Sequence, residues 1–340
     1  MNSQLAIDQD KITSILGKTL EVAERYFQTQ HDLPPGKFIN DIPMEALPQA
    51  GIGAEATLDL FEKNFAHHIT NSAGPRYFGF VTGGSTPAAI AGDWLVSAYD
   101  QNACGSNDSI APQLERQTLH FLKQFFGLDV EYFGSFVTGA TVSNTTSLAI
   151  ARQWWGEQQG VDISSEGLSG LPSLKILSGS PHSSILKSLS ILGIGRNAII
   201  KVDTLPDREA IDTSALEKKL KESSSPVIVV ANAGTVNTVD FDDLEAIGKL
   251  KTTYRFWLHV DAAFGGFAGA SEKYKHLIAG INYADSITID AHKWLNVPYD
   301  AAMQFTKHKS LQLKVFQNSA AYLGDPAKSP DFFHYRSEEH

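Results

Sequence analysis

From about residue 133 onward, short apolar runs alternate with longer amphipathic stretches, and this alternation restricts the fold more than any other feature of the sequence. Six of the apolar runs have the length and composition of strands, and helical stretches separate them. The expected strands are 135–138, 175–178, 198–202, 227–231, 257–261 and 286–290, and the expected helices include 143–158, 182–192, 213–222 and 242–254. This order predicts an α/β fold whose mainly parallel sheet is covered by helices on both faces.

Two other segments complete the outline. Apolar residues at helical spacing between about 10 and 30 predict an amphipathic helix, which ends before Pro34-Pro35-Gly36. That helix cannot bury its own apolar stripe, so the main domain or a second subunit must cover it. Segment 156–172 is rich in Gly and Ser, and we expect it to be a surface loop.

The composition favours a protein that acts on a small molecule. The 340 residues, 42% of them hydrophobic, suffice for one large domain with appendages. With 28 basic and 38 acidic residues, the net charge of -10 argues against nucleic acid or an anionic membrane as the partner. The single cysteine, Cys104, excludes an internal disulfide and favours a reducing compartment. The start of the chain has no leader pattern and no apolar run could span a bilayer, so we expect a cytoplasmic protein.

One candidate anion site stands at a predicted strand end, where ligands bind in parallel sheets. Thr138-Gly139-Ala140-Thr141 leads from a strand into a predicted helix. Its small residues let the backbone approach an anion, and the N–H groups at a helix N-terminus favour a phosphate. A glycine at a strand-to-helix turn can also serve the backbone geometry alone.

Three further polar residues stand at or just after predicted strand ends. Asp261 can pair with the protonated nitrogen of a pyridine cofactor, or it can be a helix cap or a satisfied buried acid. Lys293 follows the strand 286–290 and precedes Trp294, a setting that favours a lysine forming a Schiff base over a solvated one. His182, at a helix start, either stacks on a planar ring or caps the helix.

Two other chemistries compete with this interpretation. The possible metal ligands are His182, His259, Asp261 and His292, but their spacing fits no compact motif, so we expect no metal. A serine or cysteine nucleophile is disfavoured, because the sequence has no Gly-x-Ser-x-Gly elbow and Cys104 has no evident base.

Taken together, the motifs resemble the pyridoxal 5′-phosphate (PLP)-dependent group II decarboxylases, which include the aromatic-amino-acid, tyrosine, histidine and glutamate decarboxylases. The resemblance runs from about residue 75 to the end of the chain. It rests on Pro75-Arg76-Tyr77-Phe78-Gly79-Phe80, Thr138-Gly139-Ala140-Thr141-Val142-Ser143-Asn144, Ser180-Pro181-His182-Ser183-Ser184, His259-Val260-Asp261-Ala262-Ala263 and Asp290-Ala291-His292-Lys293-Trp294-Leu295-Asn296-Val297-Pro298-Tyr299-Asp300. The last two segments, in this order, are highly specific.

The resemblance implies PLP fold type I, the aspartate-aminotransferase type, with a mainly parallel seven-stranded sheet flanked by helices. It implies that Lys293 holds the cofactor as a Schiff base, that Asp261 pairs with the ring nitrogen and that His182 stacks on the ring. The other residues implied to bind the cofactor are Gly139, Ala140, Thr141, Thr235, Ala263, Asp290 and His292. With His182, the residues implied along the substrate channel are Phe80 and Thr82, and Tyr322 matches the tyrosine of a mobile catalytic loop. The active site is expected between two subunits of a homodimer.

Three departures from the family pattern stand out. Many relatives have Asn at position 290, so the charge of Asp290 should be tolerated only if it is directed away from the phosphate. Val236 follows Thr235 where some relatives have a second threonine. The sequence ends just past Tyr322, so the expected domains are an N-terminal helical segment (1–50), a large PLP-binding domain (51–317) and a catalytic-loop segment (318–340), without the family's C-terminal small domain.

The implied function is decarboxylation of an L-amino acid to the amine and CO2, within amino-acid metabolism. The tyrosine loop favours this reaction over transamination or a carbon–sulfur lyase reaction on the same fold. A truncated chain that binds the cofactor or a partner without turnover is the alternative from a different class. The residues do not name the substrate, because Phe80 and Trp94 suit either an aromatic substrate or the protein core.

Overall fold

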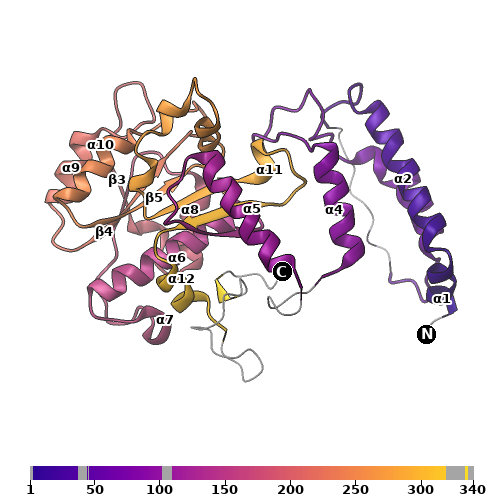
Figure 1. Ribbon diagram of the computed structural model, residues 1–340, viewed down its shortest axis with the longest axis horizontal. Coiled ribbons are helices and arrows are strands. Elements are labelled where there is room, and N and C mark those ends of the chain that lie inside the picture. The colour runs from indigo at the N-terminus through magenta and orange to yellow at the C-terminus, as the bar shows by residue number, and fades with distance from the viewer. Residues whose placement is uncertain (1–2, 37–43, 45, 102–108, 319–333, 336–340) are drawn as a thin grey trace. The chain divides into compact units, whose positions relative to one another are not determined.

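The computed structural model describes residues 3–36, 44, 46–101, 109–318 and 334–335 (Figure 1). Its contacts divide the chain into two units, Met1–Gly84 and Ser85–His340. The domain boundaries expected at 50/51 and 317/318 stay a prediction. Among the described residues, no helix is both long enough and apolar enough to cross a membrane.

The first unit is helical and contains the predicted N-terminal amphipathic helix. Its elements are α1 (Ser3–Asp10), α2 (Ile12–Thr29), α3 (Ala54–Asn64) and the 3-10 turn η1 (Ala66–His68). The ion pairs Lys18–Asp59 and Arg25–Glu62 join α2 to α3. No residue of α2 is buried, and its Leu16 is 57% exposed, so the described chain leaves the apolar stripe of this helix uncovered.

The second unit contains the alternating part of the sequence, after α4 (Pro87–Tyr99) and α5 (Ala111–Phe126). Its strands are β1 (Phe133–Val137), β2 (Ile176–Ser178), β3 (Ile199–Lys201), β4 (Val227–Asn232), β5 (Phe256–Asp261), β6 (Ser286–Asp290) and β7 (Ala302–Thr306). Its later helices are α6 (Ala140–Gln158), α7 (Ile163–Glu166), α8 (Ser183–Ile191), α9 (Thr213–Lys221), α10 (Leu244–Lys249), α11 (Ala291–Trp294) and α12 (Lys309–Phe316). Short 3-10 turns are η2 (Arg196–Ala198), η3 (Leu250–Thr252), η4 (Gly265–Ala270), η5 (Lys275–Ile278) and η6 (Ile281–Tyr283).

The seven strands form one sheet in the order β1-β7-β6-β5-β4-β2-β3. Strand β7 pairs antiparallel with β1 and with β6, and every other pairing is parallel. The predicted mainly parallel seven-stranded α/β sheet is therefore confirmed, as are the six strands read from the sequence. The carboxyl ends of the six parallel strands meet at one edge of the sheet.

Successive residues of the central strands pack into two different cores, as the two-residue period of a strand requires. In β4, Ile228 and Val230 join the core formed with α6 and α8, whereas Val229 and Ala231 join the core formed with α5, α9 and α10. In Figure 1, α9 and α10 lie on one side of the strands, and α6, α7 and α12 lie on the other. Both faces of the sheet are covered, which explains why its strands are apolar on both sides.

Two features differ from the sequence-based expectation. Strand β7 was not predicted, because Gln304 interrupts its apolar run; the side chain is fully buried and its Oε1 accepts a hydrogen bond from Ser135 Oγ of β1 at 3.3 Å. Segment 156–172 is not wholly a surface loop. It contains α7, which is capped by the side chain of Asp162. Ile163 of α7 is buried in the core formed with α6 and α8.

Candidate active site

The predicted site residues of the second unit follow the carboxyl ends of five parallel strands. Ala140 follows β1, His182 follows β2, Thr235 follows β4, Asp261 ends β5 and Lys293 follows β6. Because these strands are parallel, their ends lie at the same edge of the sheet. The topology therefore brings together residues that are more than 150 positions apart in the sequence, as from Ala140 to Lys293.

The amine of Lys293 lies against a buried carboxylate. Its Nζ is 3.1 Å from Asp290 Oδ2, and the lysine side chain is only 17% exposed. The Nε2 atom of His292 is 3.5 Å from the same oxygen. The ring of His292 stacks on Tyr299 at 3.9 Å, and its Nδ1 accepts the backbone N–H of Ala301. The imidazole therefore presents Nε2 to Asp290, since its other nitrogen is already an acceptor.

Asp290 connects this group to the N-terminus of α6. Burial raises the pKa of Asp290 above its usual range, while Lys293, His292 and the backbone N–H of Ala140 favour the ionised form. Burial lowers the pKa of His292. Among the described residues, Asp290 Oδ1 is buried without a hydrogen-bond partner. Whether the carboxylate is directed away from a phosphate, as expected for this departure from the family pattern, stays a prediction.

The N-terminus of α6 offers backbone donors without a side-chain cap. The helix has 19 residues, begins after Gly139 and has no side-chain cap. The first N–H groups of a helix have no partner within it, and the helix dipole makes this end favourable for an anion. The predicted phosphate residues Gly139, Ala140 and Thr141 occupy this first turn.

Asp261 is held by two donors at the end of β5. Its Oδ2 accepts a hydrogen bond from Asn144 Nδ2 at 3.0 Å, and its Oδ1 accepts the backbone N–H of Ala263 at 3.2 Å. The side chain is buried, with 6% of it exposed. The buried acid is thus hydrogen-bonded, as one of the sequence interpretations expected, and each oxygen still has a lone pair for a further donor.

His182 caps helix α8, as one interpretation of the sequence expected. Its Nδ1 accepts the backbone N–H of Ser184 at 3.2 Å and lies 2.8 Å from Ser184 Oγ. The His182 residue is exposed, so burial does not prevent its ring from stacking on a planar partner. Capping and stacking therefore do not exclude each other here.

Two further residues predicted to bind the cofactor, Thr235 and Ala263, form hydrogen bonds near the ends of β4 and β5. Thr235 Oγ1 accepts the backbone N–H of Asp240 at 3.0 Å, within the loop after β4. Ala263 donates to Asp261 and its carbonyl accepts the N–H of Asp290, which joins the ends of β5 and β6. The roles of Thr235 and Ala263 in cofactor binding stay predictions.

Three further residues are assigned to the substrate and the catalytic loop by the resemblance alone. Phe80 and Thr82 belong to the first unit, where Phe80 is 81% exposed and Thr82 Oγ1 donates to the carbonyl of Ser72. Tyr322 lies outside the described residues. The roles of these three residues in substrate binding and catalysis stay predictions.

Sequence reasoning missed three residues that hold the site together. Asn144 contacts Asp261, and its Oδ1 lies 2.9 Å from Nε2 of His259. His259 is fully buried, and the sequence identifies it only as a possible metal ligand. Ser184 contacts both Asn144 and His182. Ser286 contacts the other nitrogen of His259 at 2.9 Å. The available sequence signal was the polar residue Asn144, one helical turn after Ala140. The partners of Asn144 are distant in sequence, so this signal does not identify them.

The buried imidazole of His259 makes stability depend on pH. Burial lowers the pKa of His259 from its ordinary value of 6.5 to about 4, with Asp261 acting against this shift. The unfolded chain therefore binds a proton between these values while the folded chain does not, so this contribution is present above pH 6.5 and is lost as the pH falls. The loss is about 3 kcal/mol of the free energy of unfolding by pH 4.

Urea unfolding at pH 7 and pH 4 tests this expectation against His259→Gln, which cannot take up the proton. The wild-type chain should lose about 3 kcal/mol more than the variant over this interval. An equal loss in both proteins would show that His259 does not control the pH dependence.

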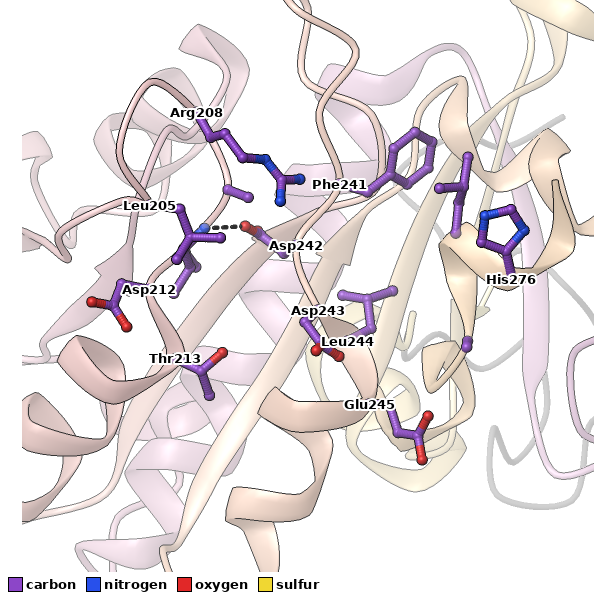
Figure 2. Close-up of a pocket in the computed structure, with 14 residues that line it drawn as sticks. Leu205, Arg208, Asp212, Thr213, Phe241, Asp242, Asp243, Leu244, Glu245 and His276 are labelled. Atoms are coloured by element: carbon purple, nitrogen blue, oxygen red, sulfur yellow. Dashed lines mark hydrogen bonds between the residues drawn. The ribbon is translucent and has the colours of Figure 1, made fainter.

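A separate polar cavity of about 560 Å³ lies among the segments after β3 and β4 and in η5 (Figure 2). It contains none of the predicted site residues. Its buried Asp242 accepts the backbone N–H groups of Ile211 and Asn232, both at 2.6 Å, and burial raises its pKa to about 6. Asp242 thus joins the loop after β3 to the end of β4. In the described part of the chain, no group of three or more His, Cys, Asp or Glu side chains is arranged to hold a metal ion.

Comparison with known proteins places this geometry in a family. The family model described as the pyridoxal-dependent decarboxylase conserved domain matches residues 35–336. The aromatic-L-amino-acid decarboxylase of Bacillus atrophaeus is 30% identical over 286 residues, which cover 83% of this chain and 57% of that protein. The chain therefore spans little more than half the length of this curated relative.

Two solved structures share the fold. TDC of Oryza sativa with PLP and tryptamine has a TM-score of 0.86 at 22% identity, and tryptophan decarboxylase of Catharanthus roseus with L-tryptophan has a TM-score of 0.83 at 21% identity. Each comparison covers 96% of this chain and 71% of the other. The expected fold type I architecture is confirmed, and the match to most of the chain shows that it belongs to the pyridoxal-dependent decarboxylase family.

Proposed function

We propose that this chain holds PLP on Lys293 and decarboxylates an L-amino acid to the corresponding amine and CO2. The observation that carries the proposal is the gathering of three groups around the first turns of α6. The first is the amine of Lys293, which is paired with Asp290, and the second is the carboxylate of Asp261, which accepts a hydrogen bond from Asn144. The third is the helix N-terminus after Gly139, which has no side-chain cap. A lysine, a buried carboxylate and an anion site match the three ends of this cofactor.

The donors and acceptors present fit the group. The N–H groups of the first turn of α6 suit a phosphate, since the helix has no side-chain cap and the N–H of Ala140 already faces an anion, the carboxylate of Asp290. Asp261 Oδ1 accepts only the N–H of Ala263 within the described chain, which leaves it able to accept a proton-bearing ring nitrogen. Lys293 is partly shielded from water and lies beside an acceptor of its proton, Asp290 Oδ2.

When bound, PLP supplies an electron sink for the bond that is broken at the substrate Cα. The protein's own contribution is electrostatic and positional. Asp261 keeps a negative charge where the ring nitrogen needs a proton, and Asn144 and Ala263 hold that carboxylate in place. The exposed ring of His182 provides a face for stacking. Lys293 provides the primary amine, and the carboxyl group of Asp290 can receive a proton from it.

We propose that Tyr322 protonates Cα after CO2 has left, on the basis of the sequence resemblance. A phenol next to Cα is a suitable proton donor in a water-poor site. In Tyr322→Phe, we expect fewer amine molecules for each CO2 released, because dissolved O2 oxidises the unprotonated product to aldehyde and ammonia and is itself reduced to hydrogen peroxide. Quantifying amine, aldehyde and peroxide from one reaction tests this role, and an unchanged amine yield would reject it.

We also propose a cytoplasmic homodimer. The uncovered stripe of α2 supports a second subunit, since Leu16 and Leu20 are 57% and 45% exposed in the described chain. The single cysteine and the charge of -10 agree with a reducing compartment and a small-molecule substrate. Analytical ultracentrifugation of the purified chain checks the oligomeric state.

The function is tested by offering a panel of L-amino acids to the purified chain with added PLP and measuring CO2 and amine. The names of the curated relative and of the tryptophan decarboxylase put aromatic amino acids first in the panel. Amine and CO2 in equal amounts support the proposal. Amino transfer to an added keto acid without CO2 would assign the chain to the transaminases, and PLP binding without any turnover would make it a cofactor-binding protein.

A further inference from the structure

We propose that Asn144 is the positioning residue that ties Asp261 and His182 together, and that a buried chain of donors from Trp257 fixes its orientation. This inference rests on the proposed function, because it concerns the same site. Asn144 lies in α6 and is fully buried. Every polar group of its side chain is used: Nδ2 lies 3.0 Å from Asp261 Oδ2 and 3.1 Å from Ser184 Oγ, and Oδ1 lies 2.9 Å from His259 Nε2.

The direction of the buried hydrogen bonds follows from Trp257, which lies at the end far from Asp261. The indole N–H of Trp257 can only donate, and it donates to Ser286 Oγ at 2.9 Å. The Ser286 hydroxyl is therefore free to donate its own hydrogen to His259 Nδ1, 2.9 Å away. His259 is neutral at pH 7, because burial lowers its pKa to about 4, so its single proton is on Nε2. That proton is donated to Asn144 Oδ1.

The opposite end gives the same direction. A carboxylate can only accept, so the amide hydrogens of Asn144 must face Asp261, and its carbonyl must face His259. The orientation of the Asn144 amide, which atomic positions alone often leave ambiguous, is thus set twice by chemistry. A flipped amide would place its carbonyl against the Asp261 carboxylate and its NH2 against the N–H of His259.

The second amide hydrogen of Asn144 extends the chain to His182. It is donated to Ser184 Oγ, which leaves the Ser184 hydroxyl free to donate to His182 Nδ1 at 2.8 Å. The backbone N–H of Ser184, which can only donate, reaches the same nitrogen at 3.2 Å. Since Nδ1 of His182 accepts from both groups of Ser184, the ring N–H of His182 is at Nε2.

Asn144 thus couples two site residues that follow different strands. Asp261 ends β5 and His182 follows β2, and one amide sets the carboxylate of the first and, through Ser184, the tautomer of the second. Loss of this amide should free both groups. It removes one of the two donors of Asp261 and leaves Nε2–H of His259 buried without an acceptor.

The direction of these hydrogen bonds is tested by nitrogen NMR on the full wild-type protein with ¹⁵N-labelled histidine, at pH 7.5. We expect both His259 and His182 to show a protonated Nε2 and an unprotonated Nδ1. A proton on Nδ1 of His259 would overturn the assigned direction. This measurement requires no variant, cofactor or turnover, so it stands even if the chain decarboxylates nothing.

The positioning role is tested with Asn144→Ala and a matched control, Ser147→Ala. Ser147 lies about one turn further along α6, is equally buried, and its hydroxyl has no hydrogen-bond partner among the described residues. Asn144→Ala should bind PLP about tenfold to a hundredfold more weakly, as expected when a hydrogen bond to a charged group is lost. Ser147→Ala should bind like the wild type. Equal PLP affinity in the two variants would reject the proposal.

A second pair of variants applies if Asn144→Ala does not fold. His259→Gln keeps a side-chain N–H for Asn144 Oδ1, whereas His259→Leu removes it. We expect PLP affinity and the absorption spectrum of the bound cofactor to stay close to wild type in the first and to change in the second. Identical behaviour of both variants would show that His259 does not orient the amide.

Discussion

Replacing Lys293 with Ala or with Arg is expected to lower the rate of CO2 release at least about a thousandfold, because only a primary amine can hold the cofactor covalently. Lys293→Arg is the sharper variant. It keeps a positive charge beside Asp290, which lies 3.1 Å from the native amine, so that the carboxylate does not lose its partner. A defect shared by both variants is therefore a defect of the amine and not of the ion pair.

Borohydride labelling gives an independent measurement of the same assignment. Treatment of the yellow PLP-loaded protein should bleach it and leave a reduced adduct on the peptide that contains Lys293. Lys187→Ala, on the exposed surface of α8, serves as the control and should retain colour, adduct and rate. An adduct on a different lysine, or substantial turnover by Lys293→Arg, would refute the assignment.

Replacing Asp261 with Asn should lower kcat about tenfold to a hundredfold while PLP still binds. A charge-assisted hydrogen bond is worth about 1.5–3 kcal/mol, which corresponds to one to two powers of ten in rate if it acts in the transition state. The substituted amide is nearly the same size, and its oxygen can still accept from Asn144 Nδ2, which is 3.0 Å from the native carboxylate. The change therefore removes the charge and keeps the packing, but it places an NH2 group against the backbone N–H of Ala263, which the native Oδ1 accepts.

Asp242→Asn is the matched control for this experiment. Asp242 is buried to a similar extent, 3% exposed against 6% for Asp261, but it joins the loop after β3 to the end of β4 at the separate cavity. An amide there places an NH2 group against a backbone N–H, so the control should reduce stability without reducing the rate of the folded protein. Near-normal kcat in Asp261→Asn, or equal loss in both variants, would argue against an electrostatic role of Asp261 toward the ring nitrogen.

The fold was largely readable from the sequence because its signals are local. The apolar runs around Val229 and Val260 have the length of strands buried on both faces, and the amphipathic stretches between them have the length of covering helices. Lys293, Asp261 and His182 could be singled out for the same reason, since each stands beside a strand end that the pattern predicts. Strand β7 was not predicted because Gln304 interrupts its apolar run, and the partner of its Oε1, Ser135, is 169 positions earlier in the sequence.

What only the tertiary structure decided is how these residues are held. The sequence by itself determined the α/β class, the strand ends and the residue types that stand there, because periodicity and turn chemistry depend on neighbours along the chain. It did not determine that Asn144 forms a hydrogen bond with Asp261, 117 positions away. Nor did it determine that His259 is a neutral imidazole hydrogen-bonded to Asn144 rather than a metal ligand. Such contacts depend on strand order and on burial, and a buried polar group must find its partner wherever the fold brings one within hydrogen-bonding distance.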